Sequence, residues 1–130
     1  EYTDTPDDVQ LELEKKLISA GARLIIGSHP HVLQEIKWND DKQLTAFSLG
    51  NFVFTTSTKE LANYTVALDI QLTPEGIANV KVWPAKIDFG LIRYLDEGNH
   101  ERQQVIERLE QLSPTIRIRE DGEVMMSSLE

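Results

Sequence analysis

The chain has 130 residues, of which 40% are hydrophobic and 27% are charged. This length is typical of one domain, and the composition excludes an intrinsically disordered chain. The formal net charge of −9 argues against partners such as nucleic acids and anionic membrane surfaces, because these are bound mainly through Lys and Arg. The absence of cysteine excludes disulfides and thiolate chemistry.

The first four residues, Glu1-Tyr2-Thr3-Asp4, show neither an initiator Met nor the pattern of a signal peptide. We therefore expect the sequence to be a piece of a longer protein. Leu129 and Glu130 are interpreted as a vector-derived remnant and are left out of the fold prediction. The longest uncharged run, residues 44–58, contains polar residues throughout and falls short of the about 20 apolar residues that a membrane-spanning helix needs.

The N-terminal segment has the pattern of a helix followed by a buried strand. A helix is predicted over residues 6–20, with Thr5 as its cap and Gly21 as its stop. The apolar run 22–27 predicts a short strand whose face this helix covers. This order of elements is typical of α/β proteins. The apolar stripe expected to cover the strand consists of Val9, Leu13, Leu17, Ile18 and Ala20.

The rest of the chain is predicted to be rich in strands. Pro84 is expected to end the ladder of the strand before it, because proline has no N–H to donate. The predicted elements are hairpins over 32–38 with 43–49 and over 64–72 with 77–83, a short strand over 91–95, a helix over 99–112, and a terminal hairpin over 115–119 with 123–126.

The residue types for a metal or acid–base site occur in the segment Gly27-Ser28-His29-Pro30-His31. It follows a predicted strand, and ligands of α/β sheets bind beyond the carboxyl ends of strands. Pro30 is expected to hold His29 in an extended conformation, which would aim both imidazoles at one point. Two histidines suit Zn, Mn, Fe or Ni but do not complete a site, because such ions need four to six ligands. The alternative is that both histidines simply pack at the end of a strand.

A second candidate segment is 48–52, which also follows a predicted strand. Gly50 and Asn51 permit a turn with positive φ that would bring the Asn51 amide to the rim of the same sheet, although an ordinary turn is an equally good interpretation. His100 is interpreted as solvated surface. The acidic cluster Asp4, Asp7 and Asp8 favours helix-start electrostatics over a cation site.

These fragments, taken in order, resemble a known family. The matching pieces are Glu1-Tyr2, Pro6, Gln10, Ala20-Gly21-Ala22, the run from Ile25 to Gln34 with Gly27-Ser28-His29-Pro30-His31 at its centre, and the run from Phe47 to Phe54. Together they resemble the CapA-type poly-γ-glutamate capsule biosynthesis proteins, which belong to the calcineurin-like metallophosphatase superfamily. The resemblance is dense over residues 1–54 and thinner from residue 60 onward.

The resemblance implies roles for individual residues. His29 and His31 would be ligands of a dinuclear centre of divalent Mn, Zn or Fe, and Glu1, Gly50 and Asn51 would line the site, with no catalytic residue assigned. The remaining ligands would lie upstream, so the missing N-terminal half of the same protein is the expected partner. We therefore expect no catalysis and weak or no metal binding from these 130 residues alone.

The predicted fold class is α/β, the C-terminal half of a metallophosphatase-like α/β sandwich, strand-rich with two main helices. Residues 1–128 would form one part-domain, with a site-bearing segment over 1–55 and a β-rich extension over 56–128. One alternative function is a non-catalytic accessory subunit that acts with poly-γ-glutamate and other capsule synthesis subunits. The resemblance suggests an extracytoplasmic or membrane-anchored location at the bacterial surface. A third interpretation makes residues 56–130 an interaction module of their own.

Overall fold

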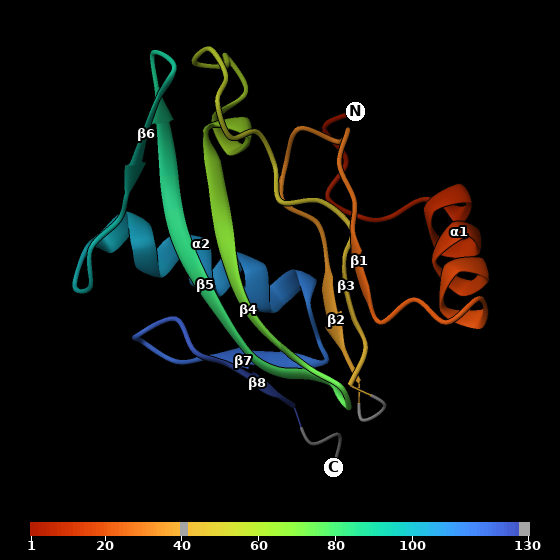
Figure 1. Cartoon of the computed structure of the whole chain (residues 1–130). Coiled ribbons are helices and arrows are strands. Elements are labelled where there is room, and N and C mark those ends of the chain that lie inside the picture. The colour runs from red at the N-terminus through yellow and green to blue at the C-terminus, as the bar shows by residue number, and fades with distance from the viewer. Residues whose placement is uncertain (40–41, 128–130) are drawn as a thin grey trace.

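The computed structural model describes residues 1–39 and 42–127 of the chain. Two helices and three small sheets make up a mixed α/β fold that is rich in strands, as the sequence predicts (Figure 1). The described helices include none that is long and apolar enough to cross a membrane. In chain order the elements are α1 Asp8–Ser19, β1 Leu24–Ile26, β2 Ile36–Trp38, β3 Leu44–Ala46, the 3-10 turn η1 Glu60–Asn63, β4 Tyr64–Thr73, β5 Gly76–Asp88, β6 Leu91–Tyr94, α2 His100–Leu112, β7 Ile116–Ile118 and β8 Val124–Met126.

The first sheet has the order β1-β3-β2, with β1 parallel and β2 antiparallel to the central β3. The predicted hairpin of β2 and β3 is confirmed, although residues 40–41 of its loop lie outside the described residues. The prediction that β1 is buried is wrong for the described chain, because Leu24 and Ile25 are half-buried and Ile26 is 49% exposed. β1 is an edge strand in the described sheet, and α1 lies to one side of it (Figure 1).

Helix α1 turns its apolar stripe away from the rest of the chain. Val9, Leu13 and Leu17 are 73%, 54% and 37% exposed, so the prediction that this stripe covers the strand is also wrong here. The side chain that faces inward is Glu14, which is 7% exposed and accepts a hydrogen bond from Lys37 of β2 at 3.0 Å. This polar contact, in place of an apolar one, attaches the helix to the sheet.

The start of α1 also differs in detail from the prediction. Asp7, rather than Thr5, is the N-cap, because its side chain accepts a hydrogen bond from the Gln10 N–H at 2.8 Å. The Gln10 side chain in return accepts from the Asp7 N–H at 3.0 Å, which completes a capping box. Gly21 follows the helix with a φ of +99°, as its predicted role as a stop requires.

The second sheet is built on the long hairpin of β4 and β5. The predicted end of β5 at Pro84 is wrong, because the strand continues to Asp88 and Pro84 pairs with Val66. In an antiparallel ladder the nitrogen and carbonyl of one residue point toward the same neighbour. The Pro84 carbonyl accepts a hydrogen bond from the Leu95 N–H at 2.9 Å, so the nitrogen also points away from β4. The ladder between β4 and β5 therefore loses no donor at this proline.

One hydrophobic core connects the two sheets, α2 and the β7–β8 hairpin. From α2 it receives Val105, Ile106 and Leu109, which are 4%, 4% and 1% exposed. The Ser113 hydroxyl after α2 accepts a hydrogen bond from the Ile36 N–H of β2 at 2.9 Å. The C-terminal elements therefore support the sheet from which the two candidate segments emerge.

Candidate metal-binding site

The histidine segment leaves the sheet at Gly27, where the end of β1 passes very close to the residue after β3. The Gly27 N–H donates to the Ala46 carbonyl at 2.7 Å, and a Cβ at position 27 would come within 2.3 Å of the Phe47 carbonyl oxygen. Any other residue at position 27 would push the end of β1 away from Phe47. Since β1 and β3 are parallel, both candidate segments emerge at the same edge of the sheet.

The backbone of the histidine segment is not extended, and that prediction is wrong. His29 has a φ of +107° and His31 a φ of +65°. A proline disfavours only helical geometry at the residue before it, so Pro30 does not force His29 to be extended. In this loop the Tyr2 N–H donates to the Pro30 carbonyl at 2.8 Å. Positive φ costs about 1–3 kcal/mol at a residue other than glycine, and such strain is concentrated at functional sites. The two imidazole centroids nonetheless lie 6.2 Å apart.

Asn51 fixes the orientation and the protonation of the His31 ring. The Asn51 Nδ2 donates to the Ala62 carbonyl at 3.1 Å, so the amide oxygen must face the other way. That oxygen lies 2.7 Å from His31 Nδ1, which therefore carries the ring proton in the neutral imidazole. Nε2 is left with its lone pair free. This is the arrangement by which proteins prepare a histidine to ligate a metal.

The Nε2 atom of His31 faces the start of the chain. It lies 3.8 Å from Oε1 of Glu1. That distance is shorter than about 4.1 Å, the sum of a Zn–N and a Zn–O bond, so both atoms could contact one ion. The rings of Tyr2 and Phe54 pack beside the His31 ring, each with its centroid 5.5 Å from that of His31. His29 is exposed beside this group.

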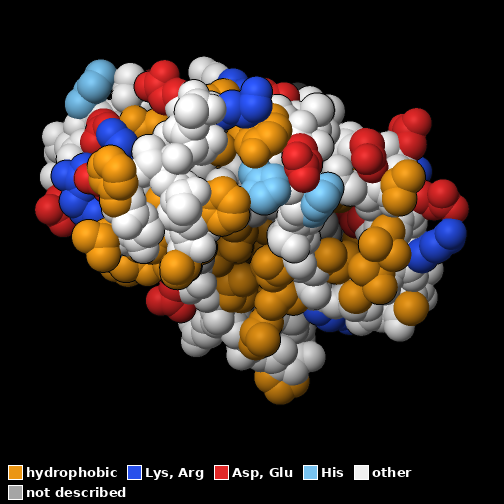
Figure 2. All heavy atoms as spheres, turned by 90° about the horizontal axis from the view of Figure 1, so that it is seen from above, with side chains coloured by type: hydrophobic (Ala, Val, Ile, Leu, Met, Phe, Trp, Pro, Cys, Tyr) orange, Lys and Arg blue, Asp and Glu red, His pale blue; other side chains and the backbone are white. Residues whose placement is uncertain are grey.

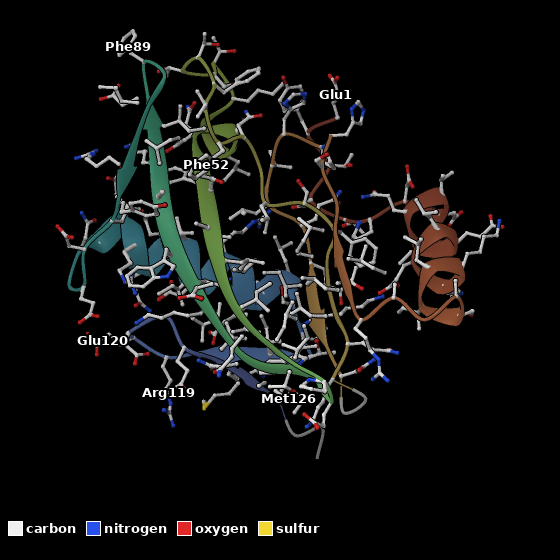
Figure 3. The ribbon with its side chains drawn as sticks, in the orientation of Figure 1. Glu1, Phe52, Phe89, Arg119, Glu120 and Met126 are labelled. Carbon is white, nitrogen blue, oxygen red and sulfur yellow. The ribbon has the colours of Figure 1, made fainter. Side chains whose placement is uncertain are left out.

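The figures place the candidate site at one end of the molecule. Two histidines lie side by side next to a band of hydrophobic side chains, and the third lies apart from them (Figure 2). Glu1 is at the end of the molecule where Phe89 also lies, whereas Arg119 and Met126 are at the opposite end (Figure 3). His100 begins α2 on the exposed surface, as the sequence predicts.

Gln34 holds the N-terminal segment against the histidine loop and was not identified from the sequence as a site residue. It is fully buried, and its amide nitrogen donates to the carbonyls of Thr3 at 2.9 Å and Thr5 at 3.3 Å. Its amide oxygen accepts from Gln10 Nε2 at 2.9 Å. Its place at the end of the family-like run from Ile25 to Gln34 was a signal for it in the sequence. By holding the backbone of Thr3 and Thr5, Gln34 positions the segment that begins with Glu1.

The remaining candidates serve mainly structural roles. Gly50 has a φ of +77°, as predicted, and a Cβ there would lie 3.0 Å from the Tyr64 carbonyl. Asp7 caps α1, as the helix-start interpretation requires, but Asp4 pairs with Arg108 of α2. Within residues 1–39 and 42–127 no group of three or more His, Asp or Glu side chains is arranged to hold a metal ion.

The pKa values of Glu35 and Glu101 are shifted in opposite directions. Burial raises the pKa of Glu35 above its ordinary value of 4.5, which nearby Lys37 partly offsets. The pKa of Glu101 is lowered, chiefly by its hydrogen bond from Lys86 and next by that from the Tyr64 hydroxyl. The pKa of Lys86 is correspondingly raised by Glu101. Glu101 of α2 thus contacts Lys86 and Tyr64 of the second sheet, whereas Glu35 directly precedes β2 of the first sheet.

The chain is similar to known proteins of capsule biosynthesis. Residues 1–56 match the family described as bacterial capsule synthesis protein PGA_cap. The capsule biosynthesis protein CapA of Bacillus anthracis is 39% identical over 94 residues, which cover 69% of this chain and 21% of the relative. The PGA biosynthesis protein CapA of Bacillus subtilis (strain 168) is 36% identical over 90 residues, or 67% of this chain and 22% of the relative. The chain thus spans about a fifth of the length of these relatives. The predicted resemblance to CapA-type capsule biosynthesis proteins is confirmed.

Proposed function

From this kinship with CapA-type capsule biosynthesis proteins, we propose that the chain is part of a metal-dependent phosphoesterase. His29 and His31 bind divalent metal there, as two ligands of a dinuclear centre. The observation that carries the proposal is the pair of contacts of Asn51, which places the proton of a neutral His31 ring on Nδ1 and leaves Nε2 facing Glu1. A bound divalent ion would polarise a phosphoryl oxygen and activate water for attack on the phosphoester.

The chain's own residues contribute binding and orientation. Asn51 holds the His31 ring, and the rings of Tyr2 and Phe54 pack against it. The left-handed backbone at His29 and His31 sets the two rings before any ligand arrives. Such preorganisation reduces the cost of metal binding.

The other ligands must come from elsewhere, because two histidines and one carboxylate do not fill a dinuclear centre. A surface is available for the part of the protein that would supply them. The stripe Val9, Leu13 and Leu17 on α1 is exposed, as is Ile26 on β1. β1 also has an open edge in the described sheet. In this proposal the N-terminal half of the same protein covers that surface and brings the remaining ligands to the histidines.

The metal content of the full-length protein tests the proposal. His29→Ala and His31→Ala are each expected to lower bound divalent metal and phosphodiesterase activity, whereas His100→Ala is the matched control and should change neither. Unchanged metal content and activity in both loop variants would refute the phosphoesterase assignment. The 130-residue chain alone is expected to bind Mn²⁺ or Zn²⁺ weakly, and tight stoichiometric binding in a calorimetric titration would contradict this.

The second candidate is a non-catalytic accessory subunit for synthesis, export or attachment of poly-γ-glutamate. It is favoured by the name of the Bacillus subtilis relative, PGA biosynthesis protein CapA. A chain of net charge −9 repels a polyanion, so binding of the polymer should require divalent cations. A histidine variant that loses phosphodiesterase activity but keeps normal polymer export would favour this candidate over the enzyme.

A further inference from the structure

A cavity separate from the histidine loop lies between the N-terminal segment, η1 and α2. Its volume is about 390 Å³, which is within the range of small-molecule sites. The lining includes the buried apolar side chains of Val32, Leu33 and Val105 and the rings of Tyr2 and Tyr64. An apolar group of the size of a phenyl ring could therefore be buried there.

The charged side chains around this cavity are mainly acidic. Asp4 and Arg108 form an ion pair with each other and so largely cancel. Glu60 and Glu107 also line the cavity and are exposed. Glu107 accepts a hydrogen bond from the neutral amide of Gln103 at 3.0 Å. Lys59 offsets part of this charge, since its ammonium lies 5.0 Å from the Tyr2 ring centroid. On the α2 side, Glu107 keeps an uncompensated negative charge.

We propose that this cavity is a binding site for a small amphipathic ammonium compound. The apolar part lies against Val32, Leu33 and Val105, and the ammonium group lies toward Glu107. A carboxylate in the same position would be repelled by Glu107, so an acidic ligand such as a γ-glutamyl unit is disfavoured. The site is distinct in its ligand chemistry from the proposed metal centre, which takes anionic phosphoesters.

The cavity also shares one side chain with the histidine loop. The ring of Tyr2 lines the cavity and stacks on the imidazole of His31 at 5.5 Å. An occupant that displaces Tyr2 changes the environment of His31, so binding should shift the His31 ring resonances in an NMR spectrum. The cavity ligand needs no metal, and this inference can be tested whether or not the histidines bind one.

The experiment is a calorimetric titration of the full-length protein with three probes that share one shape. Phenethylamine carries an ammonium, phenethyl alcohol is neutral and hydrocinnamate is a carboxylate. We expect phenethylamine to bind and hydrocinnamate to bind roughly tenfold more weakly or not at all, with the alcohol between them. Equal binding of the three probes, or no binding of phenethylamine, would overturn the proposal.

Three variants assign the binding to this cavity. Glu107→Gln should reduce the preference for the amine over the alcohol, whereas Glu97→Gln removes an exposed charge outside the cavity lining and should not. Gln104→Trp, at an exposed position of the lining, should block phenethylamine while circular dichroism confirms that the protein is folded. Unchanged affinity for the amine in a folded Gln104→Trp variant would show that it binds elsewhere and would overturn the assignment.

Discussion

The two helices of the chain are alike in sequence pattern and opposite in their surroundings. α1 has 12 residues and an Asp cap, and α2 has 13 residues and an Asn cap. The apolar stripe of α2 is buried, with Leu109 only 1% exposed, whereas the corresponding stripe of α1 is open, with Leu13 54% exposed. An amphipathic pattern therefore predicts that a helix forms, but it does not tell which part of the protein covers its apolar face.

Removing one apolar side chain from each helix should reveal this difference most strongly. In the 130-residue chain, Leu109→Ala is expected to lower the free energy of unfolding by about 2–5 kcal/mol, because it opens a cavity in the core. Leu13→Ala should change it by no more than about 0.5 kcal/mol, because the side chain is exposed. Urea denaturation of both variants measures the two values.

The same pair in the full-length protein sharpens the comparison. If another part of the protein covers α1, Leu13→Ala should become destabilising there, and the gap between the two variants should narrow. A Leu13→Ala variant that stays neutral in the full-length protein would contradict the proposed covering of α1. Equal and large losses in the 130-residue chain would instead contradict the exposure of the stripe.

A smaller effect is expected at Gln34, the buried polar anchor of the α1 side. Gln34→Leu keeps the volume similar but removes the hydrogen bonds to Thr3 and Thr5, so unfolding should become easier by about 1–3 kcal/mol. Amide hydrogen exchange should show faster exchange at Tyr2, whose N–H bonds to Pro30. In α2, the core residue Leu109 should exchange faster only by as much as global unfolding becomes easier, so the larger increase is expected at Tyr2. A uniform increase across both regions would show that Gln34 is not a local anchor.

The smallest effect is expected from Glu101, on the α2 side. Its pKa is lower in the folded protein than its ordinary 4.5, so its contribution to stability is present above that value and is lost as the pH falls through the folded pKa. Glu101→Gln should therefore cost about 0.2–1 kcal/mol at neutral pH and nothing in strong acid. Glu97→Gln is the exposed control. A cost that does not depend on pH would contradict the ion pair with Lys86.

The sequence predicts the elements better than it predicts their surroundings. Periodicity locates α1, α2 and the β4–β5 hairpin because it records local preferences. Periodicity fails at Pro84. Whether this proline interrupts a ladder depends on which neighbouring strand its nitrogen faces, and the sequence pattern does not record that. Periodicity also fails to predict that Leu13 is exposed, because burial depends on which other segment packs against the helix.

The candidate site was partly predictable for a similar reason. His31 and Asn51 could be expected near each other because each follows a strand and the two strands are parallel. The positive φ at His29 and His31 was not predictable, since it depends on the contact between Tyr2 and Pro30. The anchoring role of Gln34 was missed because two of its three partners are backbone carbonyls, which leave no mark in the sequence.

The hydrogen bond from Asn51 to Ala62 connects the histidine loop to a segment that lies beyond the residues matching the capsule synthesis family. That match ends at residue 56, yet the carbonyl that dictates which way the Asn51 amide faces belongs to η1. Cut at residue 56, the amide would be free to rotate by half a turn and offer its NH₂ group to His31, which would place the ring proton on Nε2. The smallest unit that fixes the orientation of Asn51 toward His31 is therefore longer than the stretch that matches the family.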